Sequence, residues 1–195
     1  MKTLDKKLKN ISSSNYKPND FIIADAKDAD MEAGIRAPGY IRENNGALTN
    51  NPANYLAYLN KMESMTASEE VDIMLMSMTS AERLANKKIF ENSSVTPAIR
   101  LNDTSCTWGM IRNGEYGKEE SRPFATAQIN HALNYADLGL YSITFNKNID
   151  RDVYMLNQYR DFREKAEKLN MRHFLEVFNS AVLDLSIIEM GEYVN

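Results

Sequence analysis

The sequence predicts an α/β fold built around a parallel sheet, and three observations support this. Short apolar runs alternate along the chain with segments whose apolar residues recur every three or four positions, the spacing of a helix that packs on one face. The runs lack the alternation of apolar and polar residues that is typical of a strand with one face exposed to solvent. Helices are therefore expected to cover both faces of the sheet. The 195 residues, 43% of them hydrophobic, suffice for one globular core.

The first half of the chain contains two expected strands and two expected helices. Compact apolar runs predict strands over 21–26 and 71–76. Between them, apolar residues at helical spacing predict a helix over 53–70. Thr79 or Ser80 is expected to cap a second helix that runs to about residue 90.

The second half of the chain repeats this alternation. A third strand is expected over 95–101, with Pro97 near its start, where a missing N–H is tolerated. Asn113-Gly114 predicts a β-hairpin over 106–116, because a two-residue type I′ turn needs positive φ angles. The remaining expected elements are a helix over 122–136, a strand over 138–145, a helix over 150–169, a strand over 173–178 and an amphipathic segment from residue 182.

Composition excludes several classes of function. The 23 basic residues are balanced by 27 acidic ones, so no nucleic-acid partner is expected. One cysteine, Cys106, excludes a disulfide framework, and two histidines leave little for a metal centre, so no metal or cofactor is expected. No Gly-x-Gly-x-x-Gly follows the first strand. Without a long apolar run or a signal peptide, a cytoplasmic location and no membrane partner are expected.

Polar side chains gather where the expected strands end. Since the carboxyl ends of parallel strands share one side of the fold, where ligands bind, these side chains predict a binding pocket. The plainer alternative is that strands simply return to water there. The pocket is favoured by the positions of three charged residues within or directly behind apolar runs, namely Lys27, Arg100 and Glu176. The candidates for binding substrate are Lys27, Arg100, Asn102, Asp103, Thr144 and Asn146.

The alternation of side chains along each strand indicates the shape of the sheet. Asp25 and Lys27 share one face of the first strand, and Ser142, Thr144 and Asn146 share one face of the fourth. A face that becomes polar toward its carboxyl end is typical of a barrel interior, packed below and reactive above.

Four segments carry a family resemblance. Residues 21–30 (FIIADAKDAD), 97–104 (PAIRLNDT), 136–146 (ADLGLYSITFN) and 173–179 (HFLEVFN) resemble the class I aldolase-like proteins of bacteria, within the aldolase-type (β/α) barrels. The resemblance covers nearly the whole chain as the first five of eight βα units. It implies an incomplete parallel (β/α) barrel over 21–195, with a hairpin insertion after the third strand, preceded by an N-terminal arm or helix over 1–20.

The resemblance implies a lyase that acts on a sugar phosphate or related ketose through a Schiff base. Asp25 and Glu176 would be the catalytic carboxylates, with Arg100 and Lys27 as their charge partners. The Schiff-base lysine would belong to a sixth strand, beyond this chain's end. Lys27 is an unsuitable nucleophile, because nearby carboxylates favour its protonated form. We expect it to form an ion pair or to bind substrate as a cation.

Several alternatives remain open at this stage. The chain is expected to be a fragment, a barrel completed by another copy or another polypeptide, or an open flavodoxin-like sheet. A non-catalytic binding or assembly module would explain a chain without the lysine. A metal-assisted sugar isomerase or epimerase would use Glu176 and Asp103.

Overall fold

The computed structural model describes residues 1–106, 120–180 and 183–194. The chain divides into two compact units, Met1–Ile99 and Arg100–Asn195, and each is described by itself. The hairpin expected over 106–116 lies, apart from Cys106, outside the described residues.

All five expected strands are present, but the first, expected over 21–26, begins only at Ala24. The apolar side chains of Phe21, Ile22 and Ile23 lie before it and are exposed. The pairs β1–β4, β4–β5 and β8–β9 are parallel, and the order in the sheet is β1-β4-β5-β8-β9. Strands that are neighbours in this sheet are therefore consecutive parallel strands along the chain, as in a (β/α) barrel. A flavodoxin-like sheet instead has the strand order 2-1-3-4-5. The α/β class and a strand order consistent with an incomplete barrel are thus confirmed. The strands are β1 (Ala24–Lys27), β4 (Ile73–Met76), β5 (Thr96–Arg100), β8 (Leu138–Thr144) and β9 (Arg172–Phe178).

In the first unit, two helices follow the sequence expectation closely. The helix α3 spans Tyr55–Ser68, and α4 spans Met78–Asn86. The cap of α4 is not Thr79 or Ser80, however, but Ser77, whose Oγ accepts a hydrogen bond from the Ser80 amide at 3.2 Å. The helix therefore begins directly behind β4, because Ser77 already satisfies an amide of its first turn.

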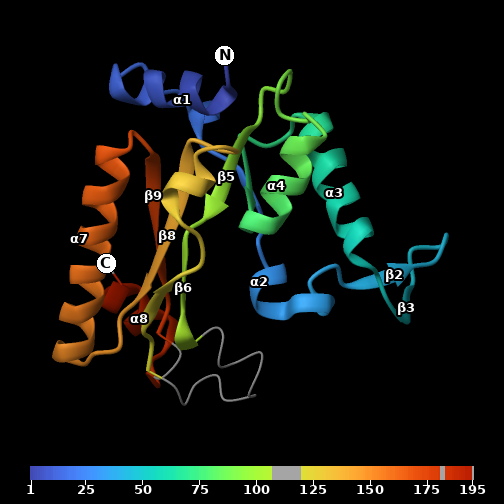
Figure 1. The fold of residues 1–195 in the computed structure, drawn as a ribbon. Coiled ribbons are helices and arrows are strands. Elements are labelled where there is room, and N and C mark those ends of the chain that lie inside the picture. The colour runs from blue at the N-terminus through green and yellow to red at the C-terminus, as the bar shows by residue number, and fades with distance from the viewer. Residues whose placement is uncertain (107–119, 181–182, 195) are drawn as a thin grey trace. The chain divides into compact units, whose positions relative to one another are not determined.

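The N-terminal helix α1 (Thr3–Ser12) lies at the amino ends of β4 and β5 (Figure 1). The Lys7 ammonium donates to the Asp72 carboxylate at 2.6 Å, directly before β4. Burial alone would raise the pKa of Asp72, but hydrogen bonds from Lys7 and from the Ile23 amide hold that pKa below its usual value. The short 3-10 turn η1 (Pro18–Asp20) links α1 to the strand region.

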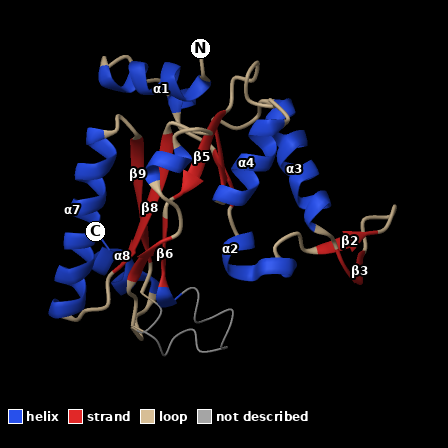
Figure 2. Ribbon diagram, viewed as in Figure 1, coloured by secondary structure: helices blue, strands red, loops and turns tan. Residues whose placement is uncertain are grey.

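The connection between β1 and α3 contains small elements that the sequence did not predict. These are α2 (Asp30–Ala33), the 3-10 turn η2 (Gly34–Arg36) and the antiparallel strands β2 (Tyr40–Arg42) and β3 (Leu48–Pro52). Figure 2 shows β2 and β3 as a short red pair set off from the sheet. Their side chains are mostly exposed, so no apolar pattern marks them.

In the second unit, α7 (Ile149–Lys168) packs on one face of β8. The Tyr141 ring of β8 lies 4.6 Å from the Phe162 ring of α7, measured between centroids. The side chain of Asn148 caps α7 by accepting from the Arg151 amide at 3.3 Å. The helix expected over 150–169 is thus present, and α8 (Ile187–Val194) follows β9.

The prediction of a helix over 122–136 is largely wrong. Pro123–Ala125 instead forms β7, which pairs antiparallel with β6 (Asn102–Thr104), and only Ile129–Ala132 is helical, as α6. The Thr126 amide donates to the Leu101 carbonyl at 2.9 Å and continues the pairing. The paired residues are 19 to 25 positions apart in the sequence, and helical spacing does not detect such partners.

Among the described residues, no helix combines the length and the hydrophobicity needed to cross a bilayer.

Candidate functional site

A buried arginine organises the polar residues of the second unit. Arg100, the last residue of β5, is 3% exposed. Its Nη2 donates to Oε2 of Glu176 at 2.9 Å and to Oγ of Ser142 at 3.3 Å. Its Nη1 lies 3.4 Å from Oδ1 of Asp103, and its guanidinium lies over the ring of Phe178, 5.5 Å from the centroid. We call Arg100, Asp103, Ser142 and Glu176 the Arg100 cluster.

The strands place these residues on one face. Ser142 and Glu176 are opposite one another in the parallel register of β8 and β9. The Ser142 hydroxyl donates to Oε2 of Glu176 at 2.9 Å, so this oxygen receives two hydrogen bonds. The Ser142 backbone is held in turn by the side chain of Asn102, which accepts from its N–H at 2.6 Å and donates to its carbonyl at 2.8 Å.

The two carboxylates of the Arg100 cluster have different surroundings. The Asp103 side chain is 1% exposed, and its Oδ1 also accepts from the Thr104 amide at 2.7 Å. The Glu176 side chain is 39% exposed. Among the described residues, no hydrogen bond reaches Oε1 of Glu176. Asp103 therefore compensates the buried guanidinium, while Glu176 keeps one oxygen available to a ligand.

Thr144 and Asn146 have structural partners. Oγ1 of Thr144 lies 3.9 Å from Sγ of Cys106. The Asn146 side chain accepts from the Ser121 amide at 2.6 Å and donates to the Ser121 carbonyl at 3.1 Å. This pairing holds the segment before β7 against the end of β8, so Asn146 is engaged with the backbone.

In the first unit, Asp25 and Lys27 lie on the same face of β1, as strand phase predicts. The Lys27 ammonium forms an ion pair with Oδ1 of Asp25, the pairing expected for this lysine. The ion pair fixes one oxygen of Asp25, while the other, Oδ2, is buried without a hydrogen bond to any described residue.

A second carboxylate in this unit was not predicted as a site residue. Oδ2 of Asp30 accepts from the hydroxyls of Ser77, at 2.7 Å, and Ser80, at 3.1 Å. The Ser80 hydroxyl is also 2.8 Å from the hydroxyl of Tyr55. Burial raises the pKa of Asp30, and the two serine hydrogen bonds offset part of this rise. Burial also raises the pKa of the neighbouring Tyr58, and the charge of Asp30 adds to that rise.

The carboxyl ends of the strands thus contribute site residues to both units. Asp25, Lys27 and Asp30 belong to the first, and the Arg100 cluster belongs to the second. The sequence argument missed Ser142 as a site residue, although its position between Leu140 and Thr144 on the polar face of β8 was the available signal. It had no signal for Asp30, whose serine partners come from the start of α4.

The Arg100 cluster is unsuited to a metal ion. The Arg100 guanidinium lies between the carboxylates of Asp103 and Glu176 and repels a second cation there. Among the described residues, no group of three or more His, Cys, Asp or Glu side chains is placed to hold a metal. The geometry therefore gives no support to a metal-assisted isomerase that uses these two carboxylates.

Comparisons of the chain with protein-family models, with characterised proteins and with solved structures found no match.

Proposed function

We propose that this chain carries acid–base and positioning residues of an aldolase-like lyase that acts on a sugar phosphate or a related ketose. The single observation that supports this most is the state of Glu176. Its Oε2 is fixed by Arg100 and Ser142, while its side chain remains partly exposed at the carboxyl end of a parallel strand. A proton-transfer group needs this combination of fixed orientation and access to the substrate.

The reaction makes one specific demand on such a group. A lysine amine condenses with the ketose carbonyl and releases water, forming an iminium. A base then removes the proton from the hydroxyl on the carbon beyond the bond to be broken. The electrons of that C–C bond move into the iminium, giving an enamine and a free aldehyde. We assign the hydroxyl proton to Oε1 of Glu176.

Arg100 and Asp25 have distinct parts in this proposal. Arg100 is too buried to meet a substrate, so it is a positioning residue that orients Glu176 through the hydrogen bond to its Oε2. Asp25, held by Lys27, is a second candidate acid–base carboxylate. The resemblance implies that the Schiff-base amine belongs to a lysine of a sixth strand, outside these 195 residues. Lys27 is not assigned this role, because its ammonium is paired with Asp25.

The test is ketose cleavage by the product of the complete open reading frame. Release of aldehyde from a panel of ketoses and ketose phosphates is followed by its enzymatic reduction with NADH. Glu176→Gln is expected to lower kcat by about 10²- to 10⁴-fold, the usual contribution of a positioned base. Glu167→Gln is the matched control, because Glu167 is an exposed α7 residue paired with Arg163.

Two results would contradict the proposal. One is cleavage with an unchanged kcat in Glu176→Gln. The other is saturable ketose binding without cleavage of any member of the panel, which would favour the alternative of a non-catalytic binding module.

A further inference from the structure

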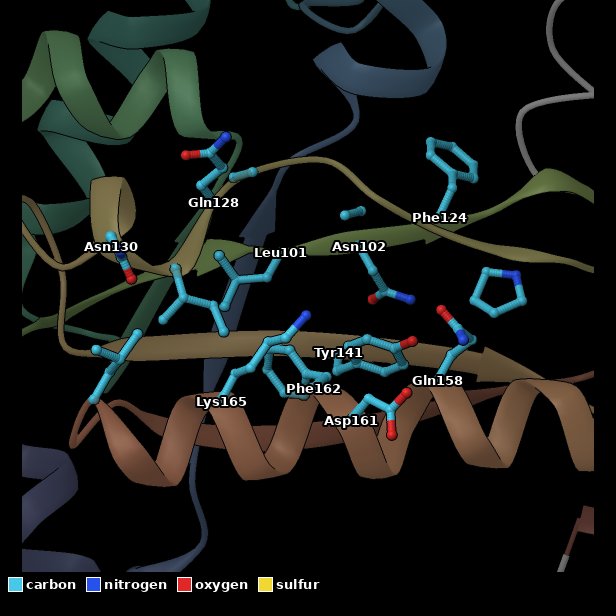
Figure 3. A pocket seen from close by; sticks show the side chains of 15 residues that line it. Leu101, Asn102, Phe124, Gln128, Asn130, Tyr141, Gln158, Asp161, Phe162 and Lys165 are labelled. Atoms are coloured by element: carbon cyan, nitrogen blue, oxygen red, sulfur yellow. The ribbon is translucent and has the colours of Figure 1, made fainter.

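A cavity of about 440 Å³ lies in the second unit, between α7 and the segment that contains β7 and α6. We call it the α7 cavity. Figure 3 shows Gln158, Asp161, Phe162 and Lys165 of α7 on one side, with Tyr141 of β8 behind them. Its volume is in the range of small-molecule sites in proteins, which are usually apolar with a few polar groups.

The α7 cavity is separate from the Arg100 cluster. Successive side chains of a strand point to opposite faces, so Tyr141 faces the cavity while Ser142 faces Glu176. A ligand in the α7 cavity would therefore not touch Glu176. This site does not depend on the proposed lyase function.

The apolar part of the cavity suits a flat ring. The Tyr141 and Phe162 rings are 4.6 Å apart between centroids and tilted by 33°. Leu101 and Phe124 also line the cavity, and Phe124 is 36% exposed. Aromatic side chains pair with planar rings in offset-stacked or edge-to-face arrangements, which favours an aromatic ligand here.

The charged residues of the cavity indicate the charge of the ligand that would bind there. Oδ1 of Asp161 accepts two hydrogen bonds from the Arg160 guanidinium, from Nε at 3.2 Å and Nη2 at 2.9 Å. The Lys165 ammonium forms neither an ion pair nor a hydrogen bond with any described residue. Figure 3 shows its side chain rising from α7 into the cavity. One available cation beside a neutralised carboxylate favours a ligand with a single negative charge.

Three amides complete the lining. The side chains of Gln128, Asn130 and Gln158 line the α7 cavity and make no hydrogen bond with other described residues. Each can donate to a carboxylate oxygen or accept from a ring substituent. From the aromatic walls, the available lysine and these amides, we propose that the α7 cavity binds a planar aromatic carboxylate.

The probe for this site is 2-naphthoate, with 2-naphthamide as its neutral analogue and 2-naphthylmethylamine as its cationic one. Isothermal titration calorimetry measures their affinities. Lys165→Met is expected to weaken 2-naphthoate about fivefold, the upper value for a solvent-exposed ion pair, and to leave 2-naphthamide unchanged. Lys168→Met is the matched control, because Lys168 is an exposed α7 residue outside the cavity.

A variant that fills the α7 cavity tests whether the ligand binds there. Ala127 lines the cavity, so Ala127→Phe should abolish binding of 2-naphthoate and of 2-naphthamide while the circular dichroism spectrum stays the same. The inference is overturned if the wild type shows no saturable binding of 2-naphthoate, if Ala127→Phe binds it normally, or if the cationic analogue binds more tightly. None of these readouts involves ketose cleavage, so this inference and the proposed function fail independently.

Discussion

Removing Arg100 should destabilise the fold far more than removing the charge of Glu176. Asp103 is 1% exposed, so Arg100→Met leaves its carboxylate buried without the guanidinium. Breaking a buried pair in this way costs about 3–5 kcal/mol of unfolding free energy. Glu176 is 39% exposed, and Glu176→Gln leaves Asp103 beside the arginine. Glu176→Gln should lower the free energy of unfolding by about 1 kcal/mol or less, in the range of exposed ion pairs.

Urea unfolding at pH 7, followed by circular dichroism, measures the free energy of unfolding of both variants. Arg160→Met is the control, because Arg160 is exposed and paired with an exposed Asp161, and its effect should stay within about 0.5 kcal/mol. A double-mutant cycle with Asp103→Asn should show a coupling between Arg100 and Asp103 of about 1–3 kcal/mol. Equal effects of Arg100→Met and Glu176→Gln, or no coupling, would refute the electrostatic account of the cluster.

Three further predictions concern stability. The pKa of Asp30 is raised by burial above its ordinary 3.8, so the folded state binds more protons than the unfolded state just above pH 3.8, and wild-type stability falls as pH rises through that window. Asp30→Asn should therefore gain stability relative to wild type between pH 3.5 and 7 in urea titrations, and a constant difference would count against the buried carboxylate. A Cβ at Gly139 would lie 2.4 Å from Cδ1 of the buried Leu101, so Gly139→Ala should cost about 1–3 kcal/mol; Leu101→Val should restore part of it, and additive losses would contradict the overpacking. Asn148→Ala removes the cap of α7 and should cost about 1 kcal/mol by thermal unfolding, whereas an unchanged Tm would show that the cap contributes nothing.

Two of the parallel strands, β4 and β8, were predictable because burial on both faces leaves a local signature. The run over 71–76 is apolar apart from Asp72, the run over 138–145 is mainly apolar, and β4 and β8 are buried along their whole length. The helix α7 was equally clear, since apolar residues recur at helical spacing over 150–169. Strand phase correctly placed Ser142 and Thr144 on one face of β8.

The β6–β7 pair and the Asp30 network were missed because they depend on distant partners. The β6–β7 pair joins residues 102–104 to 123–125 across the sequence, and no local period marks it. The Asp30 network likewise needs Ser77 and Ser80, nearly 50 positions away. A short polar segment gives no sign that its side chain will be buried until the strand beside it is known.

Trapping of the covalent intermediate with borohydride tests the central claim most directly. The product of the complete open reading frame is incubated with each ketose phosphate and borohydride, and the modified peptide is identified by mass spectrometry. The account predicts a stoichiometric adduct on a lysine outside residues 1–195, with no adduct on the 195-residue chain alone. An adduct on Lys27, or none with any ketose, would contradict it.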